Sequence, residues 1–281
     1  MTPDALTGWD EDANAEAYAA FARAFPMYSA TSRDLADRAR LTDSRLIVDL
    51  CGGTGVTAQA ILDLAPARAA VISLDNAAAM QRVGQRIVHD PRLSWVTAPA
   101  EHLAEHAPPH QVDAVVCNSA IWKTDVSAVA AAVHGVLRPG GRFVFNIGAG
   151  FAGLTQPNGQ GRTGPSLDSL IHRIAARDYG YTPPPTLDTG PKLPLAAVTH
   201  FLTEAGLTVV HTEVTTQHTA MAERKAWLSI PIFARPNGDF THAQRLDMLE
   251  KAYARTNPEE TTMTNWLVVV AQRDEPGSPA F

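Results

Sequence analysis

A short acidic and glycine-rich segment, DLCGGTG at residues 49–55, is the part of the sequence best suited to bind a ligand. It follows a short apolar run and precedes a helical pattern. Glycines allow the chain to turn tightly and let a ligand approach the backbone closely. The first turn of a helix presents free N–H groups and the positive end of the helix dipole to a carboxylate or phosphate. The segment therefore predicts a binding site for an anionic or nucleotide-like ligand.

Two classes of ligand use such a turn. Residues 53–58, GTGVTA, match the dinucleotide fingerprint G-x-G-x-x-A, so a nicotinamide dehydrogenase is one interpretation. The wider pattern favours another. Asp49 closes the apolar run just before the glycines, and Asp75 closes the next apolar run along the chain.

The elements that must position these residues alternate regularly. We expect strands at 45–50, 69–75, 93–98, 112–118, 142–147, 207–215 and 264–273, and helices at 13–25, 32–40, 56–65, 77–88, 125–137, 166–178 and 195–207. Strands alternating with helices predict a doubly wound, Rossmann-like α/β fold with a mostly parallel sheet. In such folds the ligand binds at the carboxyl edge of the strands.

Four segments in register resemble the motifs of class I S-adenosyl-L-methionine (SAM)-dependent methyltransferases. They are IVDLCGGTGVTAQAIL (47–62), VISLDNAAAM (71–80), VDAVVCNSAIW (112–122) and VLRPGGRFVFNI (136–147). The first is most similar to the D-x-x-G-G-T-G form of quinone C-methyltransferases. The motifs cover roughly residues 45–150, and the rest of the chain matches only in the order of its strands and helices. The resemblance implies a seven-stranded sheet whose last strand, at 264–273, is antiparallel and lies between the fifth and sixth.

The resemblance also implies which residues bind SAM. Gly53 and Gly55 would let the methionine part lie against the turn, and Asp49 would orient its amino group directly or through water. Asp75 would accept the ribose hydroxyls, and Met80 would pack on the adenine. The full set expected to bind the cofactor is Asp49, Cys51, Gly52, Gly53, Thr54, Gly55, Asp75, Asn76, Met80, Ala100, Glu101, Asn118 and Ser119.

Two positions depart from the family pattern. Cys51 stands where the family often has glycine. After the third strand, Ala98-Pro99-Ala100-Glu101 replaces the usual Gly-Asp-Ala, whose aspartate bonds the adenine amine. Pro99 has neither that carboxylate nor an N–H. The backbone of Ala100 is then the group left to bond the ring.

Several of these residues also have plain structural interpretations. Asp49 could cap the turn, Asp75 could cap the helix that begins near Ala77, and Met80 could be core. Cys51 and Cys117 end neighbouring strands, so a redox pair is an alternative to two small buried side chains.

Three residues are candidates for the reaction itself. Tyr28 would close over SAM from the N-terminal helices, Trp122 would wall the substrate pocket, and His218 would act as a base after the sixth strand. The alternatives are a core tyrosine, ordinary packing and a surface histidine. No H-x-x-x-H or carboxylate spacing indicates a metal, so none is expected.

The composition restricts the partners. A net charge of -6 without a basic run disfavours nucleic acid. Two cysteines make neither a disulfide framework nor a zinc site. The first residues are not a signal peptide and no stretch is apolar enough for a bilayer span, so we expect a cytoplasmic protein that does not bind membranes. We therefore expect a small-molecule substrate, and the sequence leaves both a monomer and a homodimer as alternatives.

The expected organisation is an N-terminal helical lid at 1–44 and a SAM-binding domain at 45–281, with substrate insertions at about 148–194 and 216–263. Aromatic residues in the insertions suit an organic metabolite: Phe151, Tyr179, Tyr181, Trp227 and Phe233. The expected reaction is methyl transfer from SAM to an O, N or C atom of a small metabolite. Alternatives are a methyltransferase-fold enzyme of elimination, cyclisation or rearrangement, and a non-catalytic SAM-binding subunit.

Overall fold

The computed structural model describes residues 8–154, 164–183 and 192–275. Much of the first expected insertion, at 155–163 and 184–191, therefore lies outside the described residues, as does the end of the C-terminal tail.

A seven-stranded sheet forms the centre of the fold, and its order is β3-β2-β1-β4-β5-β7-β6. Strands β1 to β5 are parallel, and β7 is antiparallel to both β5 and β6. This confirms the predicted sheet and the place of its last strand. The strands are β1 (Leu46–Leu50), β2 (Ala70–Asp75), β3 (Leu93–Thr97), β4 (Val112–Cys117), β5 (Leu137–Gly148), β6 (Leu207–Ala220) and β7 (Thr261–Arg273).

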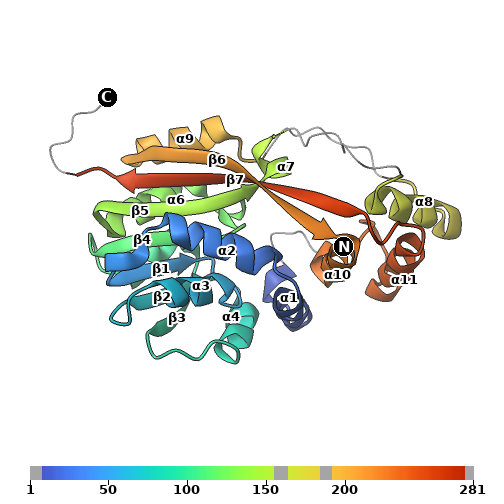
Figure 1. Cartoon of the computed structure of the whole chain (residues 1–281), viewed down its shortest axis with the longest axis horizontal. Coiled ribbons are helices and arrows are strands. Elements are labelled where there is room, and N and C mark those ends of the chain that lie inside the picture. The colour runs from blue at the N-terminus through green and yellow to red at the C-terminus, as the bar shows by residue number, and fades with distance from the viewer. Residues whose placement is uncertain (1–7, 155–163, 184–191, 276–281) are drawn as a thin grey trace.

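Helices cover both faces of this sheet (Figure 1). The α-helices are α1 (Asp12–Ala24), α2 (Met27–Arg38), α3 (Val56–Leu64), α4 (Ala78–Gln85), α5 (Leu103–His106), α6 (Val126–Val136), α7 (Ala149–Ala152), α8 (Leu167–Tyr179), α9 (Leu195–Glu204), α10 (Met221–Leu228) and α11 (His242–Tyr253). Short 3-10 helices are η1 (Gly8–Asp10), η2 (Leu41–Asp43), η3 (Ala100–His102), η4 (Ile121–Lys123) and η5 (Pro231–Phe233).

Alternation along the central strands builds a core on each side. Phe143 and Phe145 of β5 face the core shared with α5, α6 and α9, whereas Val144 between them faces the core shared with α2 and α3. Side chains of successive strand residues point to opposite faces, so a strand covered on both faces is apolar at every position. This explains the continuous apolar runs in the sequence.

Helix α2 begins at Met27, five residues earlier than the predicted start at 32. Pro26 is its N-cap residue and has a helical backbone (φ -81°, ψ -4°). A proline lacks only an N–H that the start of a helix leaves unpaired, so it separates α1 from α2 without delaying the second helix.

Strands β6 and β7 are longer than predicted and extend as a two-stranded ribbon beyond the other strands, toward α10 and α11 (Figure 1). Their pairing continues to Ala220 opposite Thr261. The hydroxyls of Thr219 and Thr262 are 2.6 Å apart across the ribbon. The first and last residues of the predicted second insertion, 216–263, therefore belong to strands β6 and β7. The segment between the two strands is 221–260.

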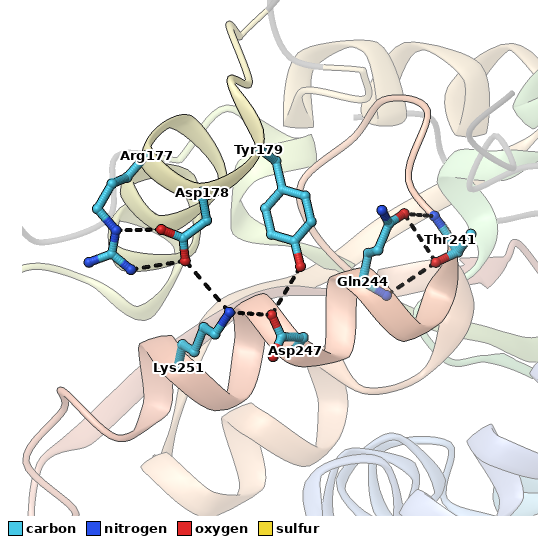
Figure 2. Close-up of polar contacts among 7 residues, drawn as sticks. All are labelled: Arg177, Asp178, Tyr179, Thr241, Gln244, Asp247 and Lys251. Atoms are coloured by element: carbon cyan, nitrogen blue, oxygen red, sulfur yellow. Dashed lines mark hydrogen bonds and ion pairs between the residues drawn. The ribbon is translucent and has the colours of Figure 1, made fainter.

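Helices α8, α10 and α11, which we call the insertion helices, share a separate apolar cluster. Figure 2 shows polar contacts between α8 and α11 around Asp247: its carboxylate accepts from the Tyr179 hydroxyl at 3.0 Å and pairs with Lys251 at 2.6 Å. Thr241 and Gln244 form a reciprocal capping box at the start of α11. The two insertions thus pack as one unit.

None of the helices in the described part of the chain combines the length and the apolar character that crossing a bilayer requires.

Candidate functional site

A cavity of about 740 Å³ opens at the carboxyl edge of the sheet. Its volume lies in the range of small-molecule sites. Of the sixteen residues predicted to bind the cofactor or take part in the reaction, twelve line it: Tyr28, Cys51, Gly52, Gly53, Asp75, Asn76, Met80, Ala100, Glu101, Asn118, Ser119 and Trp122. Four others do not, namely Asp49, Thr54, Gly55 and His218.

The glycine-rich turn has a left-handed backbone at Cys51 (φ 56°), Gly53 (φ 54°) and Gly55 (φ 82°). Cys51 is not a glycine, so its conformation costs energy that the surrounding structure must supply. Ser119, just after the neighbouring strand β4, is also left-handed, with φ 59°. A Cβ added to Gly53 would lie 3.1 Å from Met80 Cε, so the missing side chain leaves this part of the wall open.

Asp75 holds the turn in place. Its Oδ2 accepts the Gly53 N–H at 2.9 Å and its Oδ1 accepts the Ala77 N–H at 2.7 Å. Burial raises the pKa of Asp75, whereas those two N–H groups and the charge of Lys123 lower it. Each carboxylate oxygen has a second lone pair. The structural and the ligand-binding interpretations of Asp75 are therefore compatible.

Asp49 lies beneath the turn rather than on the cavity wall. It is fully buried, and its Oδ2 accepts the Ser73 hydroxyl at 3.0 Å. A Cβ added to Gly52 would lie 2.3 Å from that same oxygen. Burial raises the pKa of Asp49 to about 7, against the opposing effect of the Ser73 hydrogen bond. Because Gly52 covers the carboxylate, Asp49 does not line the cavity, and a direct contact with the ligand, one of the two predicted arrangements, does not fit this geometry.

Gly55 and Thr54 also face away from the cavity. A Cβ added to Gly55 would meet the Trp95 ring at 2.6 Å, and one added to Gly84 of α4 would meet it at 2.5 Å. Gly55 is therefore needed for its left-handed backbone and for the indole that lies between the two glycines. Thr54, expected at the cofactor, is buried beside this contact.

Asn118 attaches helix α2 to the end of β4. Its Nδ2 donates to the Ser32 and Thr31 hydroxyls at 2.9 and 3.0 Å and to the Tyr28 carbonyl at 3.3 Å. Its Oδ1 is buried, with no hydrogen-bond partner among the described residues. The next residue, Ser119, donates its N–H to Asn146 Oδ1.

Tyr28 is buried, and its hydroxyl accepts a hydrogen bond from Trp227 Nε1 at 3.0 Å. Burial raises the pKa of Tyr28 to about 12, which makes it a poor base at neutral pH. Its contact with Trp227 joins α2 to α10. Further along, the Ile232 N–H donates to Asn14 Oδ1 at 2.8 Å, joining α1 to η5.

Trp122 stacks on Phe151, with ring centroids 3.8 Å apart and planes 17° from parallel. Its buried Nε1 has no hydrogen-bond partner among the described residues. The following residue, Lys123, also lines the cavity and lies over the Trp9 ring, with Nζ 4.2 Å from the centroid. Burial lowers the pKa of Lys123 to about 8, although the charge of Asp75 raises it. The sequence reasoning did not single out Lys123, although it directly follows the predicted Trp122.

His218 is a correction. It lies within β6, opposite Met263 of β7, and it is exposed. Its neighbour Gln217 bonds inward, accepting from Trp266 Nε1 at 3.2 Å. Because side chains alternate along a strand, His218 points to the opposite face and cannot serve as a base in the cavity. No other histidine is among the described lining residues.

The wall opposite the turn comes from the second insertion. It includes Trp227 and Phe233, whose rings stack 4.0 Å apart, and three arginines, Arg224, Arg235 and Arg245. The aromatic pair was among the residues that sequence reasoning assigned to an organic substrate, but the arginines were not. Tyr179 and Tyr181, assigned with them, instead pack within the cluster of the insertion helices.

A family model described as a methyltransferase domain matches residues 47–141. That span contains the glycine-rich turn, Asp75 and the end of β4. The match marks residues 47–141 as a methyltransferase domain. Methyltransferase domains use SAM as their methyl donor.

Solved structures share the fold at low identity. A methyltransferase from Haloferax volcanii, solved with the Trm112 activator, is 16% identical with a TM-score of 0.56, over 94% of this chain and 98% of that one. Phosphoethanolamine N-methyltransferase 2 of Haemonchus contortus, solved with S-adenosylhomocysteine, is 15% identical with a TM-score of 0.51. The alignment covers 87% of this chain but only 52% of that one, so this chain spans about half the length of that enzyme. The [4+2]-cyclase SpnF is 13% identical with a TM-score of 0.54, over 88% and 81%. No curated protein matches the sequence.

The residues present fit SAM. The cavity wall offers a glycine without a side chain at Gly53, a carboxylate at Asp75, and buried polar atoms without described partners on Asn118 and Trp122. Buried polar groups are normally hydrogen-bonded, so unpaired ones on a cavity wall indicate a polar ligand. The residues belong to the ends of β1, β2 and β4, where the family motifs lie.

Proposed function

We propose that this methyltransferase domain transfers a methyl group from SAM to a small organic acceptor held beneath the insertion helices and the N-terminal helices. One observation carries the proposal: a single cavity is lined by the turn and Asp75 at the sheet edge, and by Trp227 and Arg235 from the second insertion. A donor and an acceptor can therefore meet in it. The sequence supports a small-molecule acceptor and a cytoplasmic location as parts of this proposal.

Within the proposal, Gly53 and Asp75 hold the cofactor at the turn, with Cys51, Gly52 and Asn76 beside them. Met80 packs against its base, with Ala100 and Glu101 on the neighbouring wall. Ser119 and Asn118 bound its amino-acid end. Asp49 acts indirectly, by fixing Gly52 from below.

SAM supplies an already activated methyl group, so the chain's own task is to align the acceptor and exclude water. Alignment of this kind contributes about 7–11 kcal/mol to rate enhancement. The contact between Tyr28 and Trp227 and the one between Asn14 and Ile232 close the cavity from the N-terminal side. The N-terminal helices and the insertion helices together then form the lid that limits access of water.

Lys123 is the group we assign as base for an acceptor that must lose a proton. Its Nζ lies among lining residues, between the rings of Trp9 and Trp122. A pKa of about 8 gives it a neutral fraction near physiological pH, which an exposed lysine lacks. It takes the role that the sequence interpretation gave to His218.

The test uses purified protein, methyl-labelled SAM and a panel of small phenols, amines and acids. We expect label in an acceptor and S-adenosylhomocysteine in equal amount. A Gly53→Val variant, which fills the open part of the turn beside Met80, should lose both cofactor binding and label transfer. Label transfer that survives in Gly53→Val would place the reaction elsewhere.

A second candidate is a reaction without methyl transfer in the same cavity. The likeness to a [4+2]-cyclase shows that this fold is compatible with such chemistry. It would be favoured if the protein consumed a substrate in the presence of SAM without forming S-adenosylhomocysteine.

A further inference from the structure

Three arginines converge on one end of the cavity. Arg224 comes from α10, Arg235 follows η5, and Arg245 comes from α11. All three belong to the second insertion, which the methyltransferase motifs do not include. They therefore face the part of the cavity that we assign to the acceptor.

Among the described residues, negative charge at this end is scarce. Arg224 Nη2 pairs with Asp168 Oδ2 of α8 at 2.9 Å. Arg235 Nη1 donates only to the neutral amide oxygen of Asn237, at 3.0 Å. Its remaining N–H groups have no hydrogen-bond partner within the described chain.

Arg245 donates its hydrogen bonds to backbone carbonyls. Its Nε donates to the Pro236 carbonyl at 3.0 Å and its Nη2 to the Gly238 carbonyl at 2.8 Å. Both acceptors are neutral, and no described carboxylate pairs with Arg245. These bonds fix the turn that carries Arg235, which makes Arg245 a positioning residue as well as a second charge.

Charges of both signs act on Arg235. Burial lowers its pKa, the carboxylate of Asp168 raises it, and the like charges of Arg224 and Arg245 lower it. A half-buried cation among like charges is costly unless an anion compensates it.

The other acidic lining residues do not supply that compensation. Asp75 is the last residue of β2 and holds the glycine-rich turn. Glu101 lies in η3, where its Oε1 accepts the Asp125 N–H at 2.8 Å. Both stand at the sheet edge, on elements that precede the insertions.

Aromatic rings border the arginines. The Arg224 guanidinium lies 4.8 Å from the Trp227 ring centroid, and Trp227 stacks on Phe233 at an interplanar angle of 13°. Stacked indole and phenyl rings present a flat apolar wall. A ligand that suits both features has an apolar or planar body and an anionic end.

The geometry points to an acceptor that is an organic anion, whose carboxylate or phosphate group binds Arg235 in the field of Arg224 and Arg245, with its body along Trp227 and Phe233. Guanidinium groups match the geometry of both oxyanions. This inference rests on the proposed function, because it identifies the acceptor of that reaction.

The test is calorimetric titration of protein saturated with S-adenosylhomocysteine. The probes are benzoate, phenyl phosphate and the neutral benzamide. We expect the anions to bind and benzamide to bind at least ten-fold more weakly. Arg235→Met should weaken anion binding about ten-fold or more, and Arg235→Lys by less, because lysine keeps the charge but loses the planar fork. Arg255→Met, an exposed arginine after α11, is the matched control and should bind as the wild type does.

Whichever anion binds more tightly identifies the oxyanion of the acceptor. Equal affinity for benzamide and the anions, or unchanged anion affinity in a folded Arg235→Met variant, would overturn the inference. If that variant does not fold, the comparison of charged and neutral probes on the wild type decides. Failure of S-adenosylhomocysteine itself to bind would instead refute the proposed function, so the two failures are distinguishable.

Discussion

Replacing Asp49 with asparagine should change how stability depends on pH. Asp49 is fully buried, and burial is the main cause that raises its pKa from 3.8 to about 7. The Ser73 hydroxyl donates a hydrogen bond to Asp49 and can equally donate to the amide oxygen of an asparagine. The substitution therefore removes the titrating carboxyl while keeping its shape.

The magnitude follows from the shift. A rise of about 3 pH units at about 1.36 kcal/mol per unit corresponds to about 4 kcal/mol. For an acid whose pKa is raised by folding, the unfolded state releases its proton first. The wild type therefore loses this stability as pH rises from about 4 to about 7, and above 7 the loss is complete. The variant does not experience it.

We expect the free energy of unfolding of Asp49→Asn, relative to wild type, to increase by about 4 kcal/mol between pH 4 and pH 8. Asp49 Oδ1 is buried without a hydrogen-bond partner among the described residues, so an amide NH2 placed there would impose a cost of about 1–3 kcal/mol at every pH. The predicted quantity is accordingly the change with pH, not its value at one pH.

The assay is urea unfolding of the cofactor-free protein, followed by tryptophan fluorescence at pH 4, 5, 6, 7 and 8. Asp63→Asn, an exposed aspartate of α3, is the control variant. A difference between Asp49→Asn and wild type that is the same at pH 4 and pH 8 would show that the buried carboxyl carries no ionisation cost, and the reasoning would be wrong.

Three further outcomes follow from particular contacts. Gly84→Ala should lower the free energy of unfolding by about 1–3 kcal/mol, despite the better helix propensity of alanine, because its Cβ would lie 2.5 Å from the Trp95 ring. In thermal unfolding, combining it with Trp95→Leu should recover part of that loss, and simple additivity of the two effects would contradict the steric cause. Tyr28→Phe should lower the free energy of unfolding by about 1 kcal/mol, because it leaves Trp227 Nε1 without its acceptor. A double-mutant cycle with Trp227→Phe should show coupling between the two residues, and a coupling energy of zero would refute the link between α2 and α10. The methyl-transfer rate with a phenol should rise as pH increases through about 8, where Lys123 loses its proton, and Lys123→Gln should flatten that rise; a profile unchanged by the substitution would remove Lys123 as the base.

Much of the fold was predictable because local patterns agree with the global architecture. Parallel strands buried on both faces are short apolar runs, and each motif lies where such a run ends. The extent of β6 was not predictable in the same way. Its second half, TTQHTA at 215–220, lacks alternation between apolar and polar residues, so neither its end nor its inward face is visible in sequence. The misplacement of His218 follows directly from this.

The cavity was predictable in its cofactor half and largely hidden in the other. Asp75 and Gly53 are marked by their place after a strand, and the structure puts both on the wall. Asp49 also stands at the end of a strand, but only the packing of Gly52 over its carboxylate shows that it lies beneath the turn and not on the cavity wall. Arg224 and Arg235 come together through the tertiary packing of the insertion helices, which no spacing in the sequence encodes.

Calorimetric titration of SAM into the wild type and Asp75→Asn tests the central claim most directly. Asparagine retains one oxygen to accept a backbone N–H of the turn, so its effect on thermal stability should be smaller than its effect on binding. We predict one SAM site in the wild type and an affinity at least about ten-fold lower in the variant, as expected for the loss of charge-assisted hydrogen bonds. No binding of SAM to the wild type, or equal affinity in a folded Asp75→Asn, would contradict the account.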